Sequence, residues 1–251
     1  MSLLMQKINL TNESQKRKGF FLKIEELQLA TFLTLCRKIK ADTFFDIGAN
    51  VGFYTLVARK YIEFDCHAFE PSLETYNQLR QNINLNFLGE SVSIYNLALS
   101  SIEGITDFIV FSECSGMNSI AQTSIHNPTK AIDRVSVKLN KLDNLFHYTN
   151  RRLVFKVDTE GHELNVLRGG EALLSGNSCF IQVETGHGNK CRNEVIDFLG
   201  YLGYRLVFSL GPDDYFTNIS YFFTDEAKFT ILQESMNAIV DLRWDIDFKN
   251  E

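Results

Sequence analysis

The chain has 251 residues, of which 45% are hydrophobic and 22% are charged. A chain of this length and composition buries a substantial core, which excludes a disordered protein or one that depends on disulfides. The net charge of −6 argues against a nucleic-acid partner, because general nucleic-acid binders carry basic faces for phosphate.

The sequence predicts a protein of the reducing cytoplasm. Its five cysteines are scattered without a C-x-x-C pair, so they predict neither a metal site nor a disulfide framework. Residues 1–20 contain no apolar run long enough for a signal peptide, and no run reaches the length of a membrane span. No pattern specifies an oligomeric state.

Residues 24–39 carry a broad apolar stripe and predict a helix that packs across the start of a sheet. A short apolar strand over 43–45 follows, and then the turn Asp46-Ile-Gly-Ala-Asn-Val-Gly52 leads into a helix from Phe53. Glycine lets a ligand approach the backbone, and the first N–H groups of the helix point at its polar end. The alternative is a tight turn without a ligand.

The spacing of this turn indicates which ligand it would bind. A dinucleotide fingerprint needs glycines where Asn50 and Phe53 stand. Asp46 is unfavourable beside a pyrophosphate, and it fits better beside the ammonium and sulfonium of S-adenosylmethionine.

The strand over 65–69 ends in Glu70-Pro71, and Ser72 is a plausible cap for a helix over 73–86. Glu70 follows Gly48 by about 20 residues, the offset at which such folds place an acid against ribose hydroxyls. The strand over 91–95 ends at Asn96, whose amide suits either an adenine edge or a simple turn.

Residues 106–111 and 135–139 alternate as strands and predict a hairpin with a long polar loop over 113–133. A loop of about twenty residues is uncommon in a compact domain and is usually functional or mobile. Its Gly116-Met-Asn-Ser119 segment suits contact with a hydroxylated acceptor, and a disordered insertion is the alternative.

The apolar strand over 152–157 runs into Asp158-Thr-Glu160-Gly161-His-Glu163, and a helix then stops at Gly169-Gly170. Acids at the carboxyl end of a strand lie where open α/β sheets bind ligands. A divalent metal held by Asp158, Glu160 and Glu184 is conceivable. We expect none, because acids at neighbouring strand tips are common without metal.

A strand over 179–183 and a helix over 190–202 follow. Residues 205–210 and 219–223 predict two last strands, which must be antiparallel because only the Gly211-Pro-Asp-Asp214 segment joins them. A closing helix lies within 225–251. Without a linker or repeat, residues 1–251 predict a single domain in which 1–40 form an N-terminal helical extension.

The succession of these motifs over 43–184 resembles the FkbM-type family of S-adenosylmethionine-dependent methyltransferases. The blocks that carry it are Asp46-Ile-Gly-Ala-Asn-Val-Gly52-Phe-Tyr-Thr55, Phe69-Glu-Pro71, Asn96-Leu-Ala98, Leu142-Asp-Asn-Leu145 and Lys156-Val-Asp-Thr-Glu-Gly-His-Glu163. The resemblance implies a class I methyltransferase (Rossmann-like) fold: a seven-stranded, mostly parallel sheet with an antiparallel last strand and helices on both faces.

The resemblance also implies the site residues. Cofactor-binding positions are expected at Asp46, Gly48, Ala49, Asn50, Gly52, Glu70, Pro71, Asn96, Ala98 and Asp158, with Glu70 on the ribose and Asn96 near the adenine. Asp158 should face the methionine ammonium or the acceptor. The family's hydrophobic-Glu-hydrophobic-His ending of the fifth strand is altered here, as Val183-Glu-Thr-Gly-His187.

We expect O-methylation of a hydroxylated small molecule or glycan, with Asp158 or Glu160 as the catalytic base. The alternatives are a nicotinamide-dependent oxidoreductase, disfavoured by Asn50 and Phe53, and a non-catalytic protein that binds a cofactor or a partner on the same fold.

Overall fold

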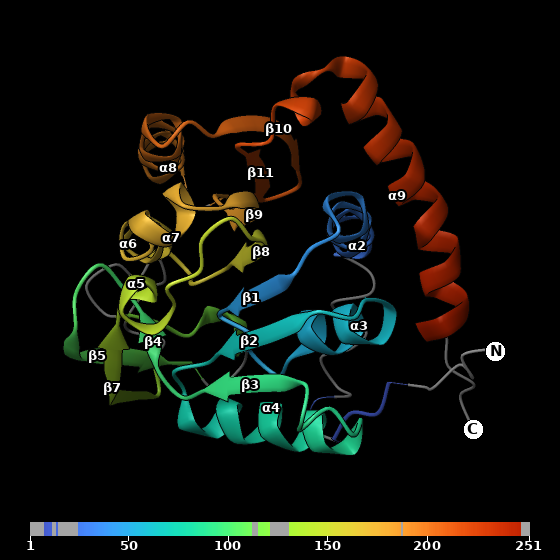
Figure 1. The fold of residues 1–251 in the computed structure, drawn as a ribbon. Helices are drawn as coiled ribbons and strands as arrows, with labels where there is room; N and C mark the ends of the chain where they lie inside the picture. Colours follow the sequence, from blue (N-terminus) through green and yellow to red (C-terminus); the bar gives the residue numbers. More distant parts are fainter. Residues whose placement is uncertain are drawn as a thin grey trace.

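The computed structural model describes residues 8–11, 14, 25–111, 115–120, 131–186 and 188–246 (Figure 1). The elements are, in chain order, α2 (Glu26–Ile39), β1 (Thr43–Ile47), α3 (Phe53–Tyr61), β2 (Asp65–Phe69), α4 (Leu73–Leu85), β3 (Val92–Tyr95), β4 (Ala98–Leu99), β5 (Gly104–Val110), η1 (Ser115–Met117), β6 (Ser119–Ile120), β7 (Asp133–Asn140), α5 (Leu142–Leu145), β8 (Arg152–Val157), α6 (Glu163–Arg168), α7 (Glu171–Ser175), β9 (Ser178–Glu184), α8 (Asn189–Tyr201), β10 (Arg205–Leu210), β11 (Asp213–Thr217), η3 (Ser220–Phe223) and α9 (Asp225–Ile246).

The main sheet has seven strands in the order β10-β11-β9-β8-β1-β2-β3. β1 pairs in parallel with β2 and with β8, whereas β11 is antiparallel to both of its neighbours. The carboxyl ends of β1, β2 and β8 therefore meet at one edge of the sheet. The predicted α/β class, with a mostly parallel sheet and an antiparallel last strand, is confirmed.

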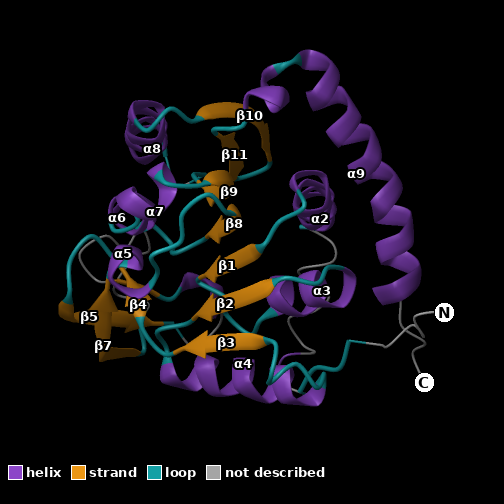
Figure 2. Cartoon of the chain, viewed as in Figure 1, coloured by secondary structure: helices purple, strands orange, loops and turns teal. Residues whose placement is uncertain are grey.

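Helices cover both faces of the sheet (Figure 2). Successive strand residues point to opposite faces, so Phe44 and Val154 pack in the core cluster beneath α2, α3 and α9, while Phe45 and Phe155 pack beneath α5 to α8. Among the described helices, none combines the length and the apolar character that a membrane crossing needs.

The position predicted for the last strand is wrong. Residues 220–223 form the 3-10 helix η3, and the strand is β11, which begins directly after the turn at Gly211-Pro212. The first two residues of β11 are acidic, so a pattern of hydrophobic residues does not predict the strand. Asp214 is nevertheless buried, because Arg192 Nε donates to its Oδ2 over 2.6 Å.

A second, smaller sheet accompanies the main one, with four strands in the order β4-β7-β5-β6. The predicted hairpin is its antiparallel β5–β7 pair. The long loop is not structureless throughout, because η1 and β6 lie within it and β6 pairs with β5. Residues 112–114 and 121–130 of the loop lie outside the described part of the chain.

Candidate functional site

The glycine turn after β1 is fixed by contacts on both sides. The backbone N–H groups of Gly48 and Ala49 donate to Phe69 O over 3.1 and 2.9 Å. Gly48 has φ +81°, and a Cβ there would lie 1.8 Å from Asp158 O. Only glycine therefore allows the tips of β1 and β8 to approach each other this closely.

Asp46 lies behind the turn and caps a helix. Its side chain is 1% exposed, and Oδ2 accepts from Thr55 N over 3.1 Å and from Thr55 Oγ1 over 2.6 Å. These bonds satisfy an N-terminal N–H group of α3 that has no partner within the helix. Burial raises the pKa of Asp46, and Lys156 opposes that rise.

Glu70, directly after β2, also accepts hydrogen bonds from backbone N–H groups. It is buried, and its two carboxylate oxygens accept from Asn50 N over 3.0 Å and from Ser72 N over 2.9 Å. One acid thus joins the glycine turn to the start of α4 and also faces a pocket.

That pocket lies at the carboxyl ends of β1, β2 and β8. It brings together Gly48, Asn50, Glu70, Pro71, Ala98, Asp158 and Glu160 of the predicted site residues. Asp46, Ala49, Gly52 and Asn96 are not on its wall. The remaining lining residues are Ile47, Phe69, Leu97, Leu99, Phe108, Gly116, Asn118, Ile120, Thr159 and His162.

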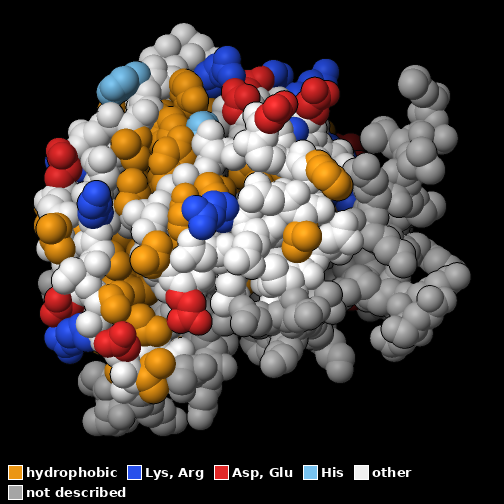
Figure 3. All heavy atoms as spheres, turned by 90° about the horizontal axis from the view of Figure 1, so that it is seen from below, with side chains coloured by type: hydrophobic (Ala, Val, Ile, Leu, Met, Phe, Trp, Pro, Cys, Tyr) orange, Lys and Arg blue, Asp and Glu red, His pale blue; other side chains and the backbone are white. Residues whose placement is uncertain are grey.

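Asn96 lies in a neighbouring groove of about 850 Å³ that shares Pro71 with the pocket. Its Nδ2 donates to Glu70 O over 3.0 Å and to Pro71 O over 2.9 Å, so it holds the turn after β2. Val135 and Val137 of the small sheet also line this groove. In the view from below, hydrophobic side chains gather on the left of the molecule, the side on which the small sheet lies in Figure 1 (Figure 3).

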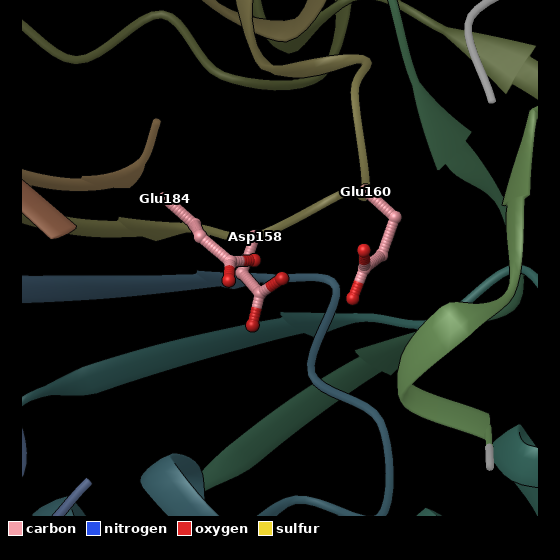
Figure 4. Close-up of side chains that lie close together, drawn as sticks. All are labelled: Asp158, Glu160 and Glu184. Atoms are coloured by element: carbon pink, nitrogen blue, oxygen red, sulfur yellow. The ribbon is translucent and has the colours of Figure 1, made fainter. Parts of the chain in front are cut away.

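Three carboxylates converge where β8 and β9 end. Asp158, Glu160 and Glu184 each offer an oxygen, and these oxygens all lie within 4.8 Å of one another (Figure 4). Burial and the charge of Asp158 raise the pKa of Glu160 to about 8 and that of Glu184 to about 11. Neighbouring carboxylates do not readily ionise together, because their negative charges repel each other. The three could therefore share protons, or a divalent cation could compensate their charge.

Sequence reasoning missed Lys156 as a site residue. It is buried, one residue before the carboxyl end of β8, and its Nζ lies 2.6 Å from Asp158 Oδ2. A lysine within the apolar run Arg-Leu-Val-Phe-Lys-Val, two positions before an acid, is the signal that could have found it, since residues i and i+2 share a face of a strand.

His162, also missed, lines the pocket and is buried. Asn165 Nδ2 donates to its Nδ1 over 3.3 Å, and its Nε2 lies 3.0 Å from Ser100 Oγ. Burial lowers the pKa of His162 to about 4, so its ring is neutral at neutral pH, with the proton on Nε2. His187, the altered end of the fifth-strand motif, lies outside the described residues.

Comparisons with known proteins agree with this geometry. The model of the Methyltransferase FkbM domain matches residues 46–206. Methyltransferase 1 of Beauveria bassiana is 26% identical over 189 residues, which are 66% of this chain and 76% of that protein. Hexuronic acid methyltransferase AglP of Haloferax volcanii is 28% identical over 148 residues, 58% of this chain and 57% of that protein.

Among solved structures, the methyltransferase FkbM from Methylobacillus flagellatus KT superimposes with a TM-score of 0.49 and 13% identity, over 70% of this chain and 43% of that chain. This chain thus spans less than two thirds of some of its relatives. The family match nevertheless covers more than half of the chain, from the glycine turn to β10. The chain belongs to the FkbM family of methyltransferases.

Proposed function

We propose that the chain transfers a methyl group from S-adenosylmethionine to the oxygen of a hydroxylated small molecule or glycan. The observation that carries the proposal is the shared pocket: Glu70 from the tip of β2 and Asp158 from the tip of β8 face the same space beside the Gly48 turn.

The residues of the pocket fit this donor. Apolar side chains, among them Phe69, Leu97 and Phe108, suit a flat adenine. The Glu70 carboxylate can accept from two ribose hydroxyls. Asp158 suits the positive end of the donor. Gly48 lets the tip of β1 lie against the Asp158 backbone, because it has no Cβ that would collide with Asp158 O.

When bound, S-adenosylmethionine supplies a methyl group on a sulfonium, which an acceptor displaces in line, so alignment provides most of the acceleration. In our proposal Glu70 fixes the ribose, Asp158 fixes the methionine end, and Glu160 or Asp158 takes the proton of the acceptor hydroxyl. A pKa of about 8 suits Glu160 to this role, because a base works best when its pKa is near the operating pH.

One relative supports a hydroxylated sugar as the acceptor. The name of AglP describes a hexuronic acid methyltransferase, and a hexuronic acid is a hydroxylated sugar. Gly116 of η1 and Asn118, which directly precedes β6, line the pocket and lie on the segment for which the sequence suggested acceptor contact. We therefore place a sugar-like acceptor first.

The test measures donor binding and then transfer. Calorimetric titration should show binding of S-adenosylmethionine and S-adenosylhomocysteine but not of NAD. Labelled methyl transfer to a panel of glycosides and small alcohols should then yield S-adenosylhomocysteine. Binding of NAD alone would favour the oxidoreductase alternative, whereas donor binding without transfer to any acceptor would favour a non-catalytic role.

The base assignment has its own test. At least one of the variants Asp158→Asn and Glu160→Gln, the one that neutralises the base, should lower turnover by about 100-fold or more, the usual contribution of a positioned base. Full turnover in both variants, with unchanged donor affinity, would show that neither residue is the base.

We expect methyl transfer to proceed without a metal, because the Lys156 ammonium already lies 2.6 Å from Asp158 and neutralises part of the acidic cluster. Enzyme treated with EDTA and desalted should retain its turnover. Loss of activity that Mg²⁺ or Mn²⁺ restores would instead assign a divalent cation to Asp158, Glu160 and Glu184.

We also propose a cytoplasmic location. Cys36, Cys66 and Cys179 are buried free thiols in the described part of the chain, as expected for a protein folded under reducing conditions.

A further inference from the structure

A lysine stands in the interior of the sheet, where charged residues are rare. In the strand register Lys156 lies between Asp46 of β1 and Gln182 of β9. All three side chains are buried on the face that α2 and α3 cover. A buried ammonium is costly unless partners compensate it, so its contacts show what keeps it there.

The ammonium has two close partners. Nζ lies 2.6 Å from Asp158 Oδ2 and 4.8 Å from the centre of the Tyr54 ring. The ring face attracts the cation and fixes its position from the side of α3. The pair is asymmetric, because the Lys156 side chain is 7% exposed whereas that of Asp158 is 29% exposed and lines the pocket. The ion pair thus joins the interior to the pocket wall.

The Tyr54 ring is held in turn by a hydrogen bond, and a carboxylate from outside the family segment adds its charge. Gln182 Nε2 donates to Tyr54 Oη over 3.2 Å. Burial raises the pKa of Glu25, and the Lys156 ammonium opposes that rise. Glu25 directly precedes α2 and is half-buried. The family match begins only at residue 46. The residue before α2 therefore adds a carboxylate whose charge acts on Lys156.

The surrounding charges keep the lysine ionised. Burial alone would lower the pKa of Lys156, but the carboxylates of Asp158, Asp46 and Glu25 together raise it above its ordinary value. Replacing a buried ion pair by apolar residues is often neutral or stabilising. A contribution to stability therefore does not by itself explain the Lys156–Asp158 pair.

We propose that Lys156 is a positioning residue of the methyl-transfer site, which holds the Asp158 carboxylate in a fixed orientation at the pocket wall. The inference rests on the proposed function, in which Asp158 binds the positive end of the donor. The Tyr54 ring fixes the ammonium from the side of α3.

The experiment is a double-mutant cycle, because a residue that acts through Asp158 must lose its effect once Asp158 is neutralised. Lys156→Met, Asp158→Asn and the double variant are titrated with S-adenosylhomocysteine, and folding is followed by circular dichroism. Lys156→Met should weaken binding about tenfold, the range of a charge-assisted hydrogen bond, and the double variant should bind as Asp158→Asn does. Lys156→Arg should bind more tightly than Lys156→Met.

A matched control lies at the other end of the same strand. Arg152 Nη2 pairs with Asp42 Oδ1 over 2.8 Å at the amino end of β8, far from the pocket. Arg152→Met removes a cation of the same kind of pair and should leave affinity unchanged. Additive losses in the double variant, or wild-type affinity in Lys156→Met, would overturn the inference.

A second variant covers the case in which Lys156→Met does not fold. Tyr54→Leu removes the ring that faces the ammonium, so it should weaken binding in wild type and have no further effect beside Asp158→Asn. Tyr61→Leu, at the other end of α3, is the control and should leave affinity unchanged. Unchanged affinity in a folded Tyr54→Leu variant would overturn the inference. If the wild-type protein does not bind S-adenosylhomocysteine, the proposed function itself fails and the inference falls with it.

Discussion

Some single residues in this protein hold backbone turns by hydrogen bonds and also line the pocket. Glu70 uses both carboxylate oxygens to accept from Asn50 N and Ser72 N. The same carboxylate lines the pocket where we place the ribose. A carboxylate can accept these bonds and still offer further lone pairs, which an amide does less well.

Glu70→Gln should therefore weaken binding of S-adenosylhomocysteine by about tenfold or more, because charge-assisted bonds to backbone N–H groups and to the ligand are lost together. Calorimetric titration measures this. Glu74→Gln, an exposed acid in the first turn of α4, is the control and should bind as wild type does. Equal affinities for all three proteins would remove Glu70 from the donor site.

Glu160 combines a raised pKa with an unusual backbone. Its φ is +55°, in the left-handed region that a non-glycine residue adopts at a cost of about 1 kcal/mol or more. Its pKa is about 8 against an ordinary 4.5, chiefly because of burial. Such features persist when the surrounding structure enforces them, and they are common at functional sites.

A pH dependence of stability follows from this pKa. Between about pH 4.5 and 8 the folded state holds a proton on Glu160 that the unfolded state has released, so the free energy of unfolding falls as the pH rises through this window. Glu160→Gln should show a shallower fall. Urea unfolding of both proteins at pH 5 and pH 8 measures the difference, and identical slopes would contradict it.

At the scale of elements, the contact between the tips of β1 and β8 positions the site. Gly48→Ala should destabilise the protein by more than about 2 kcal/mol, because its φ is +81° and the new Cβ would collide with the Asp158 backbone. Gly200→Ala in α8 meets no atom within 4 Å and should stabilise by up to about 1 kcal/mol. Urea unfolding compares the two, and a tolerated Gly48→Ala would show that the tips separate easily.

At the scale of the whole molecule, distant parts of the chain share one core. A single apolar cluster includes Leu10, residues of α2 and α3, and Ala238 of α9. We therefore predict that residues 1–251 unfold as one domain. The near-UV and far-UV circular dichroism should therefore show the same midpoint in urea. Separate midpoints would divide the chain into two units.

Local patterns in the sequence determined most of the architecture. The glycine turn, the acids after β2 and β8, and the order of strands and helices follow from signals within a few residues. Tertiary structure decided the rest. β11 begins with two acids, and its burial depends on Arg192 and on pairing with β9 and β10. The contacts that link Gln182, Tyr54, Lys156 and Asp158 join residues distant in sequence. No local pattern encodes such a network, because its charges are tolerated only once folding has brought them together.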